Sequence, residues 1–330
     1  MLKECQGQIC AGSTGKRGNH MDETRSSRAQ WGSKFGFLMA AIGSAVGLGN
    51  IWGFPFKMGQ NGGFAFLLVY LVLAVFVGYI IMNSELALGR RTGKGIIGAY
   101  HTASRRFRWV GMLGVISPFL ILMFYCVLGA YCMQYMFLNF AELAMGVYSK
   151  SAMTGADSFL AMITNPFGCI IFYGLVIIAA LSSSISLVEV LVTYLSDRAE
   201  QKGKQANRSR ITWIVSILFA IGAVLVAWDG LGANGLWVPF QNTLGIVGEF
   251  NDCWLDFLDC IAEGIAMPLG ALFMSFMIGW ELKPRYVLEE IGQTRISRFY
   301  SFCIRFVCPA TMLLVLAGQL DNFFKLGWFK

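Results

Sequence analysis

The sequence predicts an all-α membrane protein that crosses the bilayer about seven times. Of its 330 residues, 56% are hydrophobic and only 14% are charged, and the mean hydropathy is +0.60. The charged residues gather between long apolar runs, and a run of about 18 or more apolar residues is typical of a transmembrane helix. The runs lie at about 35–57, 63–88, 110–142, 167–195, 211–228, 257–280 and 300–320.

Lysine and arginine are concentrated in alternate loops between these runs. Three loops are rich in them, at 90–108, 198–210 and 283–298, whereas residues 229–252 contain none. This alternation follows the positive-inside rule and places the N-terminus and the three basic loops in the cytoplasm. The net charge of +7 therefore orients a multi-pass protein in the cell membrane and does not indicate a nucleic-acid partner.

The first apolar run contains a glycine-rich segment, Gly43-Ser-Ala-Val-Gly-Leu-Gly-Asn-Ile-Trp-Gly-Phe-Pro55. Gly43 and Gly47 alone leave two interpretations open, a GxxxG packing face or a break in the helix. The following Gly49-Asn50 and Pro55 favour a break, because helix packing requires neither. Backbone groups freed inside a membrane must face protein, water or a ligand, so such a break predicts an ion or substrate site. We expect two helical pieces within 31–57 that meet near 46–49.

No other feature indicates catalysis or a structural metal. The nine cysteines lie mostly in apolar runs and lack the spacing of a zinc site. Cys253 and Cys260 lie near the predicted outer surface, which leaves a disulfide open. The only histidines are His20 and His101, and there is no phosphate-binding loop and no nucleophile–base pair. We therefore expect a protein that is not an enzyme.

Several further motifs occur in a fixed order along the chain. They are Trp31-Gly-Ser-Lys-Phe-Gly-Phe, the glycine-rich segment, Asn61-Gly-Gly-Phe-Ala-Phe, Glu85-Leu-Ala-Leu-Gly-Arg-Arg, Tyr125, Ser182-Ser-Ser-Ile-Ser-Leu, Asp197, Asp256-Phe-Leu-Asp259, Pro268-Leu-Gly and Arg305-Phe-Val-Cys-Pro309. In this order they closely resemble the neurotransmitter:sodium symporter family over residues 28–320.

The resemblance implies an incomplete copy of the leucine-transporter-like fold, which has two inverted repeats and broken helices. Features of the family's third span are followed, across one external loop, by features of its eighth. The junction falls near 166–173, and the fourth to seventh spans are expected to be absent. The expected segments are a disordered cytoplasmic tail at 1–30, three spans at 31–145, an external loop with the junction at 146–166, the eighth to eleventh spans at 167–322, and a C-terminal tail at 323–330. Met21 is an alternative start.

The resemblance also implies binding residues. One complete sodium site would consist of the carbonyls of Gly43, Val46 and Ala179 and the hydroxyls of Ser182 and Ser183. Half of another would remain, from the Ala45 carbonyl and the Asn50 side chain. The expected substrate contacts are Ala45, Leu48, Gly49, Tyr125, Ser183 and Leu187. For the serines, an alternative is that each hydroxyl bonds the carbonyl one turn earlier.

Gate residues follow from the same resemblance. Arg28 and Asp197 match the pair that closes the cytoplasmic mouth, with Trp31 packed beneath it. Asp259 matches the acidic partner of the outer gate, but the family's arginine is replaced by Gly53. Lys57, one turn later, is a candidate substitute.

The implied function is sodium-coupled symport of an amino acid or related amine, with the sodium ion as the only cofactor and the lipid bilayer as surroundings. The internal deletion is expected to impair transport in this chain. The alternative is a non-transporting membrane remnant, or a subunit that associates with a full-length relative. Homo- or hetero-oligomers are both open.

Overall fold

A computed structural model describes residues 33, 35, 41–42, 45–47, 49–145, 166–230, 232–239, 253–292, 297–324 and 326–328. The chain divides into two units, Met1–Met39 and Ala40–Lys330. Only Ser33 and Phe35 are described in the first unit, so the architecture below is that of the second. The predicted tail at 1–30 lies outside the described residues.

Every regular element in the described part of the second unit is helical. Its first half contains η2 (Gly49–Gly53), α3 (Phe54–Gln60), α4 (Phe64–Leu73), η3 (Ala74–Gly78), α5 (Tyr79–Thr92), α6 (Ile96–Ala103), η4 (Arg105–Phe107) and α7 (Arg108–Met145). Its second half contains α8 (Pro166–Gln201), α9 (Arg208–Asp229), α10 (Trp254–Asp259), η7 (Cys260–Ala266), α11 (Met267–Phe276), η8 (Met277–Glu281), α12 (Arg285–Ile291), α13 (Ser297–Phe302), η9 (Cys303–Val307) and α14 (Cys308–Phe324).

These elements form six helices that are long and apolar enough to cross a membrane. They are Phe64–Thr92, Arg105–Leu138, Ile170–Gln201, Arg208–Asp229, Trp254–Glu281 and Ser297–Asp321. Six of the seven predicted spans are thus confirmed, and the first, at 35–57, lies partly outside the described residues. Three of the spans contain π-helical turns: η3 in the first, η7 and η8 in the fifth, and η9 in the sixth. Turns of this kind are rare and are often found at functional sites.

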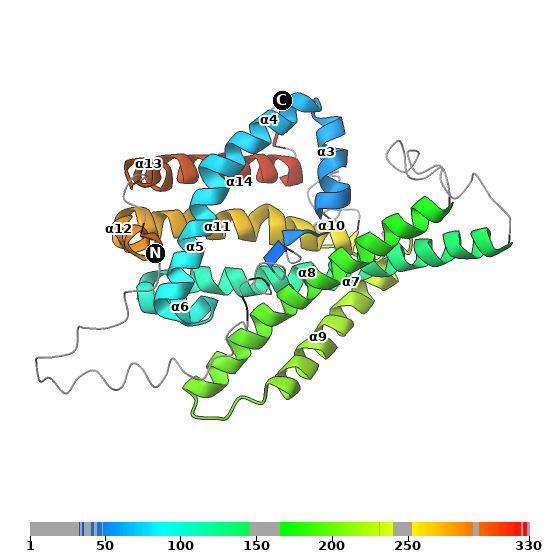
Figure 1. Ribbon diagram of the computed structural model, residues 1–330, viewed down its shortest axis with the longest axis horizontal. Helices are drawn as coiled ribbons and strands as arrows, with labels where there is room; N and C mark the ends of the chain where they lie inside the picture. The colour runs from blue at the N-terminus through cyan, green and yellow to red at the C-terminus, as the bar shows by residue number, and fades with distance from the viewer. Residues whose placement is uncertain are drawn as a thin grey trace, which may run out of the picture. The chain divides into compact units, whose positions relative to one another are not determined.

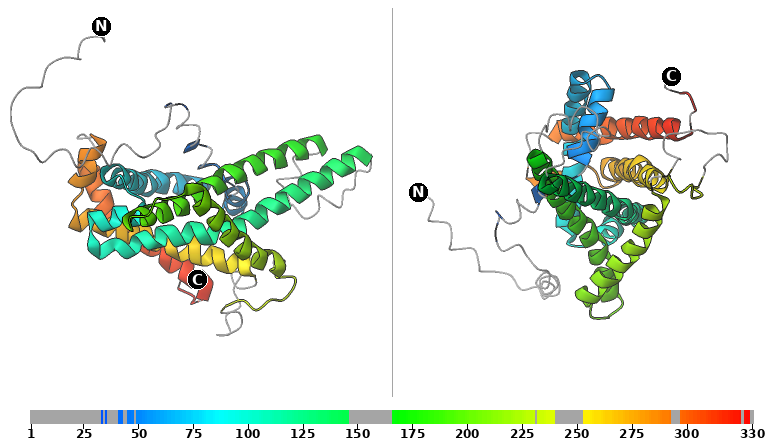
Figure 2. Two further views of the ribbon diagram at one scale, coloured as in Figure 1. Left: turned by 90° about the horizontal axis from the view of Figure 1, so that it is seen from below. Right: turned by 90° about the vertical axis from the view of Figure 1, so that its right-hand side faces the viewer.

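Helix α7 organises the packing of the second unit. It lies along α8 and α9 and also contacts α6, η7 and α11, while α11 packs on α14 (Figures 1 and 2). Buried apolar residues of α7, α8 and α9, among them Leu122, Val192 and Val215, form the core of one cluster. A second cluster joins α5 to the C-terminal helices through Ile80, Met277 and other residues. The outer face of α8 is exposed at Ile171, Leu175, Ile178, Leu181 and Ile185, as a lipid-facing stripe would be.

The ends of the helices are fastened by polar contacts. At the end of α9 the buried Asp229 accepts a hydrogen bond from the Trp254 amide at 2.9 Å, which ties α9 to the start of α10. At the end of α5 the Arg91 guanidinium donates to the Tyr286 carbonyl at 2.8 Å and lies 4.0 Å from the centre of the Tyr286 ring. These contacts hold the end of α9 against α10 and the end of α5 against α12.

Cys253 and Cys260 are both buried free thiols, so the disulfide left open by the sequence is not formed. Burial, with a further contribution from the nearby Asp256 carboxylate, raises the pKa of the Cys253 thiol to about 12. The thiol is therefore neutral at physiological pH and behaves as a small apolar group.

The contact between α6 and α7 gives a test of this packing. A Cβ added at Gly111 would lie 2.9 Å from the Ile97 Cα, whereas one at Gly89 meets nothing within 4 Å. We expect Gly111→Ala to lower the free energy of unfolding by about 1–3 kcal/mol, because backbone atoms must separate. The matched variant Gly89→Ala should be neutral or slightly stabilising. Thermal unfolding in detergent measures both, and a Gly111→Ala protein as stable as the parent would contradict the packing.

Candidate ion and substrate site

The glycine-rich segment is a break in the helix, as the sequence predicted. Residues 41–42 and 45 are helical, Val46 and Gly47 are not, and helical structure resumes as a π turn at Gly49. Gly43 and Leu48, two of the predicted site residues, lie outside the described residues.

The backbone groups near the break bond to the ends of the two helical pieces. The Val46 amide donates to the Ile42 carbonyl at 3.1 Å, and the Asn50 amide donates to the Gly47 carbonyl at 3.1 Å. The carbonyls of Ala45 and Val46 are instead bonded by side chains: Asn50 Nδ2 donates to the first at 2.9 Å and Ser183 Oγ to the second at 3.2 Å. These two carbonyls are therefore turned away from the helix ladder and toward side-chain partners.

Gly47 allows α7 and α8 to approach the break closely. A Cβ at this position would lie 2.9 Å from Tyr125 Oη and 3.2 Å from Ser183 Oγ. Behind it, Ile51 and Tyr125 pack against the buried Val176 and Ala180 of α8. The structure thus brings Val46, Tyr125 and Ser183, predicted from three separate motifs, to one place.

The sequence left open whether the serine hydroxyls of α8 bond their own helix or face the break, and both arrangements occur. Ser182 Oγ donates to the Ala179 carbonyl at 3.0 Å, and Ser184 Oγ donates to the Ala180 carbonyl at 2.8 Å, so these hydroxyls bond the preceding turn. Ser183 instead bonds across to Val46. One pair of oxygens lies within α8, between Ser182 and Ala179. The other pair joins Ser183 of α8 to Val46 at the break. Four of the five predicted oxygen ligands are therefore hydrogen-bonded in pairs.

Ala45 and Asn50 form a second pair on the other side of the break. Both side chains are exposed, as is Gly49. Rotating the Asn50 amide by half a turn would replace its nitrogen with its oxygen beside the Ala45 carbonyl, and the two oxygens could then share a cation. Leu187, the remaining predicted contact, is half-buried on α8 and packs against the clusters of α7 and α9.

The gate residues are placed in part. Asp197 Oδ2 accepts a hydrogen bond from the Gly95 amide at 2.7 Å, at the start of α6, while Arg28 and Trp31 lie outside the described residues. At the opposite end, Lys57 acts electrostatically on Asp259, together with the acidic Asp256 and Glu263. Lys57 and Asp259 are not among the ion pairs between described residues, so the replacement of the missing arginine by Lys57 stays a prediction.

The sequence did not identify the roles of Gly47 and Gly95. In the sequence Gly47 stands out only for the spacing of its GxxxG pair, whereas its lack of a side chain is what lets Tyr125 and Ser183 reach the break. The Gly95 amide gives no sequence signal as a partner, because almost every residue has an amide.

Comparison with known proteins relates the chain to sodium-dependent transporters. The model of the sodium:neurotransmitter symporter family matches residues 28–158. The uncharacterized sodium-dependent transporter YhdH of Bacillus subtilis is 31% identical over 259 residues, which are 78% of this chain and 51% of YhdH. The sodium-dependent neutral amino acid transporter B(0)AT1 of Rattus norvegicus is 33% identical over 120 residues, which are 36% of this chain and 19% of B(0)AT1.

Among solved structures, the crystal structure of MhsT in complex with L-phenylalanine matches with a TM-score of 0.69 and 21% identity, covering 88% of this chain and 100% of that one. The chain thus has the helical fold of MhsT, and its described residues include six helices that could cross a membrane and one broken helix. Residues 28–158 are thus similar to the sodium:neurotransmitter symporter family, and the similarity to YhdH extends over 78% of the chain. It spans about half of the length of YhdH and a smaller share of B(0)AT1.

The close approach at Gly47 can be tested directly. We expect Gly47→Ala to lower the unfolding temperature, because the new Cβ would push Tyr125 and Ser183 from the break at a cost of about 1–3 kcal/mol. Gly59→Ala on α3, where a Cβ meets nothing within 4 Å, is the control.

Adding Tyr125→Phe to Gly47→Ala removes the hydroxyl and should recover part of the lost stability. Thermal unfolding of the two single variants and the double variant gives their coupling free energy. Strictly additive effects would show that Gly47 and Tyr125 are not in contact.

Proposed function

We propose that this chain carries one sodium-binding half of a sodium-coupled amino acid symporter and does not complete a transport cycle alone. The observation that carries the proposal is the hydrogen bond from Ser183 to the Val46 carbonyl, beside the pair formed by Ser182 and Ala179. The hydrogen bond between Ser183 and Val46 links the broken helix to α8, and both its donor and its acceptor are oxygen atoms.

Neutral oxygens in this arrangement suit a small hard cation. Carbonyl and hydroxyl oxygens are the ligands such ions prefer, and freed carbonyls at a helix break are a recurrent sodium site in secondary transporters. A sodium ion would bind between the paired oxygens: the carbonyls would turn from the hydroxyl protons to the ion, and the hydroxyls would present their lone pairs. In this proposal the ligands are Val46, Ala179, Ser182 and Ser183, with Gly43 as the fifth.

The substrate class we propose is an amino acid or a related amine. Tyr125 lies beside the break, where its hydroxyl can donate to a carboxylate, and the amides following Gly47 offer further donors. The relative B(0)AT1 is named as a neutral amino acid transporter and MhsT was solved with L-phenylalanine, which supports the same class here. The half-site formed by Ala45 and Asn50 would hold a second sodium ion only with ligands from other spans.

Incompleteness follows from the short connection between α7 and α8. If these helices correspond to the third and eighth spans of the family, only residues 146–165 lie where four spans would be. Four spans need about 20 residues each. One wall of the substrate pocket would then be missing, and we propose that transport by the isolated chain is lost.

A second proposal is that the chain associates with a full-length relative in the cell membrane. The side chains of Ala45, Val46 and Asn50 and the backbone of Gly49 are exposed, although the break is a feature that transporters normally enclose. A complete partner could cover this surface. Transport assays separate this proposal from the first.

Sodium binding predicts a specific stabilisation. With sodium at ten times its dissociation constant, the free energy of unfolding should rise by about 1.4 kcal/mol. The comparison is thermal unfolding in detergent with sodium against potassium at equal ionic strength. The stabilisation by sodium should vanish in the double variant Ser182→Ala with Ser183→Ala. It should persist in the control double variant Ser184→Ala with Ser186→Ala, because the hydroxyls of Ser184 and Ser186 bond carbonyls of their own helix. Equal shifts in both double variants would place the effect elsewhere.

Transport by the isolated chain should be absent. In proteoliposomes with an inward sodium gradient, we expect no saturable uptake of labelled neutral amino acids, because binding at the remaining oxygens cannot alternate between two faces. Reconstituted YhdH serves as the full-length comparison. Uptake by this chain that stops when potassium replaces sodium would refute the proposed incompleteness. A change in the YhdH rate on co-reconstitution would support the subunit role.

A further inference from the structure

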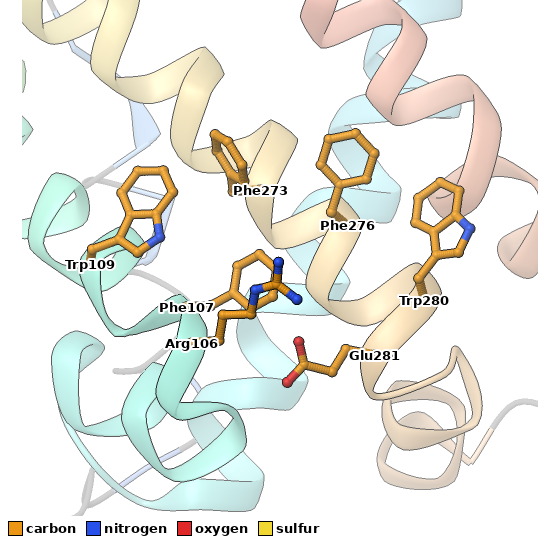
Figure 3. Close-up of a pocket in the computed structure, with 7 residues that line it drawn as sticks. All are labelled: Arg106, Phe107, Trp109, Phe273, Phe276, Trp280 and Glu281. Atoms are coloured by element: carbon orange, nitrogen blue, oxygen red, sulfur yellow. The ribbon is translucent and has the colours of Figure 1, made fainter.

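A cavity of about 730 Å³ lies away from the helix break, between the start of α7 and the end of α11. Figure 3 shows its lining: Arg106, Phe107, Trp109, Phe273, Phe276, Trp280 and Glu281. The volume falls within the range of about 300–1,000 Å³ that is usual for small-molecule sites. None of these residues takes part in the proposed sodium or substrate site.

The cavity lies where one candidate membrane span begins and another ends. One candidate span begins at Arg105 and another ends at Glu281, so Arg106 and Glu281 both lie at a boundary between apolar and polar surroundings. Trp109 is 40% exposed and Trp280 is 50% exposed. Exposed tryptophans at the ends of membrane spans are typical of residues at the level of lipid headgroups.

Two opposite charges face the cavity without forming an ion pair. In Figure 3 Arg106 and Glu281 point into the space between the two helices. Among the ion pairs found between described residues, neither Arg106 nor Glu281 takes part. Glu281 accepts a hydrogen bond from the Ser104 hydroxyl, which holds its carboxylate at the cavity edge. The site therefore offers a cation for an anionic group and, separately, an anion for a cationic group.

The rest of the lining is a continuous aromatic surface. Trp109 and Phe273 have ring centroids 4.6 Å apart, Phe273 and Phe276 6.1 Å, and Phe276 and Trp280 5.3 Å. This row runs from Trp109 of α7 across Phe273 and Phe276 of α11 to Trp280 of η8, on one side of the two charges (Figure 3). It provides apolar contact for a hydrocarbon chain, and its ring faces also attract an ammonium group.

We propose that this cavity binds a zwitterionic aminophospholipid, with phosphatidylethanolamine as the matching headgroup. The phosphate binds the Arg106 guanidinium, which can donate two parallel hydrogen bonds. The primary ammonium binds the Glu281 carboxylate, and one acyl chain lies along Phe273, Phe276 and Trp280. A purely anionic headgroup would satisfy Arg106 but would be repelled by Glu281. A choline headgroup keeps the charge but has no N–H to donate.

The test compares lipids on the purified full chain in detergent. Phosphatidylethanolamine, phosphatidylcholine and phosphatidylglycerol with the same acyl chains are added at equal mole fraction. We expect phosphatidylethanolamine to raise the unfolding temperature by about 2–4 °C over phosphatidylcholine. Native mass spectrometry should show one lipid retained in preference. An equal or larger rise with phosphatidylglycerol would overturn the proposal, since it would indicate general attraction to basic loops.

Variants locate the effect in the cavity. Arg106→Gln and Glu281→Gln should each abolish the preference for phosphatidylethanolamine, whereas Arg105→Gln, one residue away but outside the lining, should retain it. A preference that survives in both Gln variants would place the lipid elsewhere and refute the assignment. Soluble phosphoethanolamine distinguishes the headgroup from the lipid. We expect no thermal shift from it at the same concentration, and a shift equal to that of the lipid would contradict the role of the aromatic surface.

Discussion

The arrangement of this chain depends on one constraint, that a helix broken inside a membrane must find partners for the backbone groups it frees. The carbonyls of Ala45 and Val46 lose their place in the helix ladder and are bonded by Asn50 and Ser183. Because the partner of Val46 lies on α8, satisfying the break also fixes that helix against it. Oxygen atoms are thereby concentrated at one point, where an ion could replace protons as their common partner.

The long helices α7 and α8 supply the rigidity that this point requires. Tyr125 and Ser183 reach the break only because Gly47 has no side chain, and Tyr125 also packs against the buried Val176 and Ala180. An ion site needs its oxygens placed to within a fraction of an ångström, so the supporting core matters as much as the ligands. In this chain buried residues of α8 pack against Tyr125 on one side of the break, whereas Ala45, Gly49 and Asn50 are exposed.

The fold class and the centre of the site could be predicted from the sequence because they depend on strong local signals. Apolar runs predicted six described spans, and glycines followed by Asn50 and Pro55 predicted the break. The position of Ser183 at the break could be predicted because its motif resembles that of a known family, whereas its role as an ion ligand stays a prediction. Contacts made by backbone groups could not be assigned, as for the Gly95 amide on Asp197, since an amide carries no residue-specific signal. The charged cavity could not be predicted for a related reason, because Arg106 and Glu281 are far apart in sequence and come to line one cavity only through the packing of α7 on α11.

Binding and transport make different demands on such a structure. Binding needs oxygens near one point, and in the proposed site they come from Val46, Ala179, Ser182 and Ser183, which are hydrogen-bonded in two pairs. Transport needs the same point to open to one membrane face and then to the other, with about 2.3 kcal/mol available per charge for each 100 mV of potential. That energy can be used only if ion release is prevented until substrate has moved, which requires walls on both sides of the break. Since the residues around Asn50 remain exposed, an ion bound here could leave without moving substrate. The proposed loss of transport therefore follows from the open side of the site, even where the sodium ligands themselves are retained.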